Sequence, residues 1–127
     1  EQAMEICHDV KDSGMECGIS INPSTNVEDI YPLLESRLMK VVDILAVEPG
    51  FGGQRFQESA LEKIRKLVHF RLKTKQKFEI MVDGGINQET AKQTVQADIL
   101  VAGTYLFNKS NLKDGVEELE ASFATDP

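Results

Sequence analysis

Apolar and polar residues alternate along the chain in blocks that predict helices and strands in turn. Strands are predicted where apolar residues run almost without interruption, and helices where they recur every three or four positions. The predicted helices are 1–12, 26–37, 58–73, 88–96 and 112–123, and the predicted strands are 16–21, 41–47, 78–82 and 99–102. Such alternation with short connections is typical of βα units and a parallel sheet. The pattern therefore indicates the α/β class.

The same periodicity predicts how several single side chains are oriented. Ile6 and Val10 should share one face of the first helix, and Val116 and Leu119 should face inward from the last. Asn26 is expected to cap the second helix, since a short polar side chain can accept from the free N–H groups there.

Four βα units of about 30 residues each are compatible with two architectures. A four-stranded parallel sheet can form an open sandwich, or half of a parallel (β/α)8 barrel of the TIM type, whose usual length is about 250 residues. In such barrels the phosphate site lies on the loops after strands 7 and 8. The glycines described below follow the last strands of this chain, which favours the half barrel. The 127 residues are enough for a single domain spanning 1–127.

Composition excludes several functions. The formal net charge of −7 disfavours nucleic acid as a partner, and the basic run between Lys63 and Lys77 is interpreted as a solvated helix face and the loop after it. Cys7 and Cys17 fit no zinc or redox spacing, so reduced, buried thiols in a cytoplasmic protein are expected. No apolar run is long enough to span a membrane, and no signal peptide is recognisable, so no membrane partner is expected.

Glycines follow the carboxyl ends of three successive predicted strands, in the segments 47–54, 82–86 and 101–104. Glycine lets backbone N–H groups approach an anion closely, so these loops suit a phosphorylated substrate. The predicted phosphate-binding residues are Gly50, Phe51, Gly52, Gly53, Gly84, Gly85, Gly103 and Thr104. The alternative is that the glycines only allow tight turns. Three glycine loops at successive strand ends favour the phosphate.

Asp83 is the strongest catalytic candidate, because it ends an apolar strand just before two glycines. A carboxylate there can act as a general acid or base, or can bind a divalent metal. The alternative is a turn aspartate that caps the next helix. Glu48 and Asp43 are interpreted as structural, although Asp43 shares strand parity with Leu45 and so can point inward. His8 and His69 fall on helices and are not expected to be ligands.

The segments VEPGFGGQ (47–54), VDGGI (82–86) and VAGT (101–104) resemble the ribulose-phosphate 3-epimerase family in order and spacing, and 18–23 looks like that family's fifth strand and turn. The resemblance implies a (β/α)8 barrel, of which this chain covers strands five to eight. It implies an isomerase of the pentose phosphate pathway that interconverts D-ribulose 5-phosphate and D-xylulose 5-phosphate. It also implies proton transfer by two aspartates and a divalent metal (zinc, iron, manganese or cobalt), with Asp83 as the second aspartate and a metal ligand.

The chain also departs from the family pattern. The first half of the family's barrel, with its other catalytic aspartate, two histidine ligands and a serine, has no counterpart here. Leu45, Gln96 and Thr104 stand where the family usually has methionine, glycine and serine. The 127 residues of this chain are therefore not expected to epimerise a substrate unaided. The chain opens at Glu1 without methionine, and an epimerase would need about 90 to 100 further residues upstream.

Two other functions stay open at this stage. One is epimerisation of another ketose phosphate, and the other is a non-catalytic phosphosugar-binding or interaction protein derived from a half barrel. These two functions and the ribulose-phosphate epimerase share a small phosphosugar as partner. A half barrel would expose two sheet edges, so a homo-oligomer is a further expectation.

Overall fold

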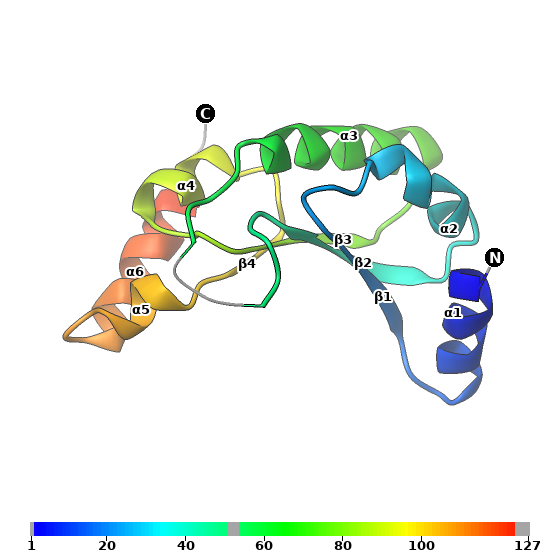
Figure 1. Ribbon diagram of the computed structural model, residues 1–127, viewed down its shortest axis with the longest axis horizontal. Coiled ribbons are helices and arrows are strands. Elements are labelled where there is room, and N and C mark those ends of the chain that lie inside the picture. The colour runs from blue at the N-terminus through cyan, green and yellow to red at the C-terminus, as the bar shows by residue number, and fades with distance from the viewer. Residues whose placement is uncertain (1, 51–53, 124–127) are drawn as a thin grey trace.

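The computed structural model describes residues 2–50 and 54–123 and arranges them around one parallel sheet (Figure 1). The four strands are β1 (Cys17–Ile21), β2 (Met39–Leu45), β3 (Glu79–Asp83) and β4 (Ile99–Val101). They lie side by side in chain order, and every neighbouring pair is parallel. The predicted α/β class and parallel sheet are confirmed, and each strand begins and ends within two residues of its prediction.

Six α-helices and one 3-10 helix accompany the strands within the described residues. They are α1 (Gln2–Asp12), η1 (Val27–Ile30), α2 (Tyr31–Glu35), α3 (Ser59–Thr74), α4 (Gln88–Gln93), α5 (Thr104–Phe107) and α6 (Leu112–Phe123). The predicted helix 26–37 is divided into η1 and α2, because Pro32 has no N–H to continue the hydrogen-bond ladder. The prediction for Asn26 is wrong in part: it precedes η1, but its side chain makes no capping hydrogen bond.

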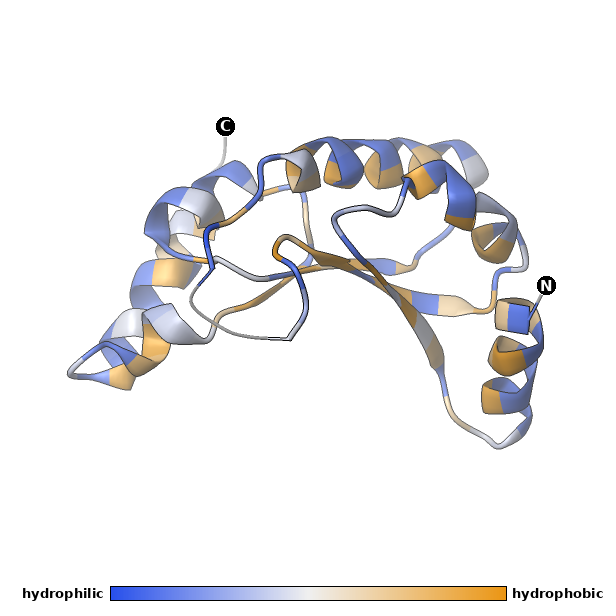
Figure 2. Cartoon of the chain, in the orientation of Figure 1, coloured by the Kyte–Doolittle hydropathy of each residue, from blue (hydrophilic) through white to orange (hydrophobic). Residues whose placement is uncertain are grey.

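The core lies between one face of the sheet and the long helix α3. Alternate strand residues point to this face, and Val42, Ile44, Ile80 and Val82 are completely buried there. Leu67 of α3 is also completely buried. Figure 2 shows the apolar residues of α3 turned toward the sheet. This packing fixes which strand residues point the opposite way.

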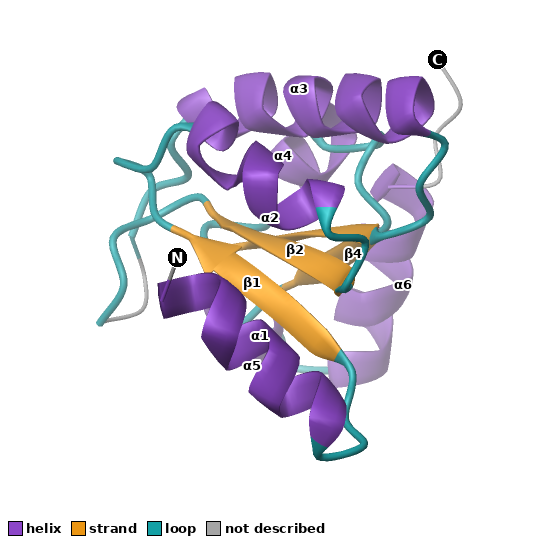
Figure 3. Cartoon of the chain, turned by 90° about the vertical axis from the view of Figure 1, so that its right-hand side faces the viewer, coloured by secondary structure: helices purple, strands orange, loops and turns teal. Residues whose placement is uncertain are grey.

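The opposite face of the sheet, called the open face below, has no helix across its middle. Figures 1 and 3 show α2, α3 and α4 on one side of the strands, with α1 beside the β1 edge and α6 beside the β4 edge. Strand parity and register bring Val41, Asp43, Leu45, Met81 and Asp83 to the open face. All five are only partly buried.

Several expectations for single residues can now be compared with the structure. Cys7 and Cys17 are buried free thiols, as predicted. Leu119 is buried as predicted, but Val116 is 37% exposed, so its inward placement is wrong. Ile6, for which the pattern predicted no inward placement, is 55% exposed. Both lie on helices at the ends of the sheet, α6 and α1, where the described chain offers no further strand to cover them.

The basic run also contains an exception. Lys63 is buried, and its ammonium donates to the backbone carbonyls of Asn22 and Pro23 at 2.7 and 2.8 Å. Burial lowers the pKa of this ammonium. Lys63 therefore ties α3 to the turn after β1 and does not belong to a solvated face.

Candidate functional site

Asp83 is the last residue of β3, at the carboxyl end of the sheet. Its register partner on β2 is Leu45, and both side chains belong to the open face. The β3 strand holds Asp83 firmly, since its carbonyl accepts from the N–H of Ala46 at 2.8 Å. The predicted catalytic residue thus lies at a strand end on the face that no helix covers.

A second carboxylate, Asp43, shares the open face with Asp83. Ser20 of β1 donates its hydroxyl to Oδ2 of Asp43 at 3.2 Å. The other oxygen, Oδ1, is buried and has no hydrogen-bond partner among the described residues. Burial raises the pKa of Asp43, the Ser20 hydrogen bond lowers it, and the charge of Asp83 raises it again. The two carboxylates are therefore electrostatic neighbours.

The loop after β2 is closed on itself by side-chain hydrogen bonds. Gln54 donates to the carbonyl of Glu48 at 2.7 Å and accepts from its N–H at 3.2 Å. Further along, the N–H of Gln57 donates to the carbonyl of Ala46 at 2.8 Å. Glu48 thus has a structural role through its backbone, in line with the interpretation from sequence. Phe51, Gly52 and Gly53 lie outside the described residues.

The two glycines after Asp83 are fitted to this loop by close contact. A Cβ atom on Gly84 would lie 2.6 Å from a methyl group of Val47. A Cβ atom on Gly85 would lie 2.5 Å from the backbone nitrogen of Phe56, and Gly85 has a φ of +67°. Both glycines therefore have a packing reason to be glycine, whether or not they also contact a phosphate.

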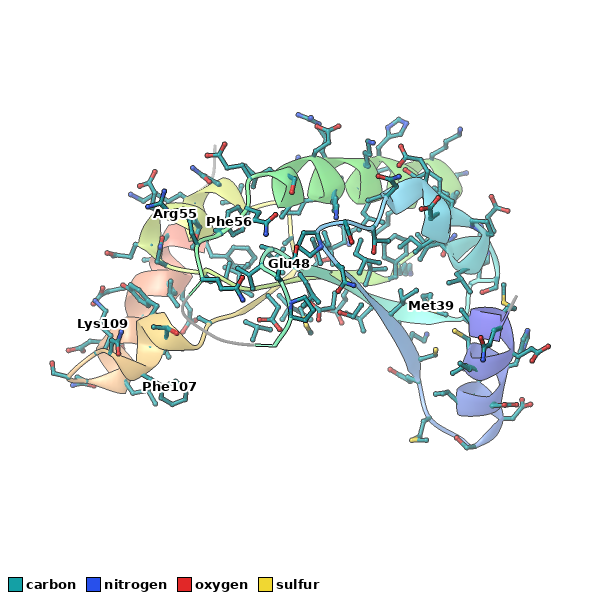
Figure 4. All side chains as sticks on the ribbon, in the orientation of Figure 1. Met39, Glu48, Arg55, Phe56, Phe107 and Lys109 are labelled. Atoms are coloured by element: carbon teal, nitrogen blue, oxygen red, sulfur yellow. The ribbon has the colours of Figure 1, made fainter. Side chains whose placement is uncertain are left out.

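The described chain has an open cavity of about 510 Å³ beyond the carboxyl ends of the strands. It brings Gly85 and Thr104, two of the predicted phosphate residues, together with Gln54, Arg55 and Phe56. Gly50, Gly84 and Gly103 are not among its lining residues. Figure 4 shows Arg55 and Phe56 beside α4. Sequence reasoning missed Arg55, because the loops that form the cavity lie far apart in the chain.

Thr104 enters the cavity from the first turn of α5, which the sequence pattern did not predict. Helix α5 is fixed to α6 by Glu118, which accepts from the Tyr105 hydroxyl at 2.7 Å and from the Lys109 ammonium at 2.9 Å. These hydrogen bonds lower the pKa of Glu118. The anchored helix holds Thr104 at the edge of the cavity.

The described residues do not complete the predicted metal site. Among the described residues, no group of three or more His, Cys, Asp and Glu side chains gathers closely enough to hold a metal ion. Both histidines are exposed on helices, as expected. Asp83 is one predicted ligand, but the described chain alone does not fit a metal ion.

The four-stranded parallel sheet with its accompanying helices defines the chain as an α/β protein. Comparison with known proteins is more specific. Residues 1–107 match the model of the Ribulose-phosphate 3 epimerase family, and the chain belongs to this family.

Individual relatives agree with the family match. The chain is 35% identical over 116 residues to the ribulose-phosphate 3-epimerase of Bacillus subtilis, covering 89% of this chain and 52% of the relative. It is 34% identical to the cytoplasmic isoform of this enzyme in Oryza sativa, covering 93% and 51%. For the Methanocaldococcus jannaschii enzyme the identity is 37%, covering 90% and 49%. The chain thus spans about half the length of these relatives. Within its described residues, no helix is long and apolar enough to cross a membrane.

Proposed function

We propose that this chain is the C-terminal half of a (β/α)8 barrel that epimerises D-ribulose 5-phosphate at C3, with residues 1–127 forming one domain. The observation that carries the proposal is the position of Asp83. It ends a strand on the open face, and the predicted phosphate loops follow the same ends of β2, β3 and β4. Relatives named as this epimerase match most of the chain.

In the proposed reaction Asp83 moves the proton at C3. The neighbouring carbonyl at C2 makes the C3–H bond acidic, so a carboxylate can remove the proton and leave an enediolate. Return of a proton to the other side of C3 gives the epimer. The glycine loops hold the phosphate meanwhile and keep C3 at a fixed distance from Asp83.

Inversion requires a second acid on the opposite side of the substrate. Asp43 does not meet this requirement, because it projects from the same face of the sheet as Asp83. We therefore propose that the second carboxylate, the remaining metal ligands and the cover of the open face come from a complementary half barrel. The relatives are about twice as long as the matched region, which supports this requirement.

The test is a fusion of this chain behind the N-terminal half of the Bacillus subtilis relative. Conversion of D-ribulose 5-phosphate and exchange of its C3 proton with heavy water are measured by NMR. Asp83→Asn should reduce both by about 10²- to 10⁴-fold, the usual size of a general acid–base contribution. Asp29→Asn, on an exposed aspartate of η1, is the matched control and should leave both unchanged.

Near-normal exchange in the Asp83→Asn fusion would defeat the assigned role. A folded fusion that binds the sugar phosphate but exchanges no proton would instead favour the non-catalytic phosphosugar-binding function. If only a different ketose phosphate exchanged its proton, the chain would instead be assigned to an epimerase for that substrate.

A further inference from the structure

We propose that Arg55 is a substrate-binding residue. Its side chain binds the phosphate group in the cavity beyond the strand ends, together with the backbone of the glycine loops. The identity of the ligand rests on the proposed function. The role of Arg55 rests on the cavity itself, on the anchoring of the residues beside it and on the charges that surround it.

The cavity places Arg55 with two groups suited to an anion. Its lining includes Gly85, which has no side chain to block its backbone, and Thr104, whose side chain carries a hydroxyl. A guanidinium adds several N–H donors in a plane that matches two phosphate oxygens at once. The three residues come from three different segments, those that follow β2, β3 and β4, with Thr104 in the first turn of α5. Together they can surround a phosphate from more than one side.

Arg55 is held in place by its two chain neighbours. Gln54 is fixed to the backbone of Glu48 by the reciprocal pair of hydrogen bonds described above. Phe56 is buried, with 7% of its surface exposed, and its backbone lies directly against Gly85. The backbone of Arg55 is therefore fixed between two anchored residues, which reduces the ordering that a bound anion would otherwise require.

The charges in the cavity indicate why a cation is needed there. Arg55 is the only Lys or Arg among the described residues that line it, whereas Glu58 and Glu89 contribute two carboxylates. A phosphate dianion held by backbone N–H groups alone would lie close to these negative charges. None of the ion pairs found in the described parts of the chain involves Arg55, so the guanidinium is available to the ligand.

The experiment measures the affinity of the chain for inorganic phosphate by calorimetry at low ionic strength. Arg55→Gln should weaken binding by about tenfold or more, as expected for a charge-assisted hydrogen bond. Arg55→Lys should be intermediate, because an ammonium keeps the charge but not the bidentate geometry. Lys92→Gln is the matched control: it removes one positive charge from α4, outside the cavity lining, and should change affinity by less than about twofold.

Equal phosphate affinity in the parent chain and in Arg55→Gln would overturn the inference, and so would an equal loss in Lys92→Gln. Absence of phosphate binding to the parent chain would overturn it as well. In the fusion with the complementary half, Arg55→Gln should raise KM and leave kcat unchanged, while Asp83→Asn should lower kcat. Failure of Arg55 and failure of the epimerase proposal are therefore separate results.

Discussion

Replacing Gly85 by alanine should destabilise the fold by about 2 to 5 kcal/mol, for two reasons that add. A φ of +67° is the left-handed region, which costs a residue with a Cβ about 1 to 2 kcal/mol. The new Cβ would also lie 2.5 and 2.7 Å from the nitrogen and Cα of Phe56, and backbone atoms cannot rotate away. Forcing such a contact costs about 1 to 3 kcal/mol.

Substitutions at two further glycines separate the cost of the positive φ from the cost of the contact with Phe56. Gly14 has a φ of +88° and nothing within 4 Å of its Cβ position, so Gly14→Ala carries the strain without the collision. Gly103 also has nothing within 4 Å and no positive φ, so Gly103→Ala should leave stability nearly unchanged. Any loss of phosphate affinity in Gly103→Ala would then come from the anion site and not from the fold.

Urea unfolding followed by circular dichroism measures the series. With a urea dependence of about 2 kcal/mol per molar, the midpoint of Gly85→Ala should fall by about 1 to 2.5 M. The midpoint of Gly14→Ala should fall by roughly half as much or less. If Gly85→Ala and Gly14→Ala unfold at the same midpoint, the contact between Gly85 and Phe56 is not rigid and the packing argument fails.

Asp43→Leu should stabilise the chain by about 1 to 2 kcal/mol near pH 7, because it removes a buried oxygen without a partner among the described residues and a charge facing Asp83. Since the folded-state pKa of Asp43 is raised, its ionised form penalises folding, and the gain should shrink as the pH falls toward about 4. Lys63→Met should destabilise by about 1 to 3 kcal/mol, since the carbonyls of Asn22 and Pro23 lose their donor. Urea midpoints check both, and an unchanged midpoint contradicts either prediction.

The sheet could be predicted from sequence because most residues on both of its faces are apolar, so its strands read as nearly continuous apolar runs. The helices were harder where they are short. Pro32 divides one predicted helix, and α5 has only four residues, too few to show a helical period. Predicted ends were least accurate at 88–96, where the helix ends at Gln93 in the structure.

The candidate site shows a similar limit. The position of Asp83 at a strand end is a local property and could be predicted. Its neighbour Asp43, with the Ser20 hydrogen bond, depends on the register of three strands, which sequence parity alone does not give. Arg55 was missed for the same reason, since its importance comes from loops that meet only in the folded chain.

The exposure of Ile6 and Val116 bears on how the sheet is completed. Both are apolar and exposed, and they belong to α1 and α6, the helices beside the β1 edge and the β4 edge. Val101 on β4 is 38% exposed, and Val116 lines an apolar cavity of about 330 Å³ against that strand. Apolar residues at both edges and an uncovered face with Asp83 are what a closed barrel would bury. The same complementary half that the proposed reaction needs for its second acid would thus also satisfy the packing of this chain.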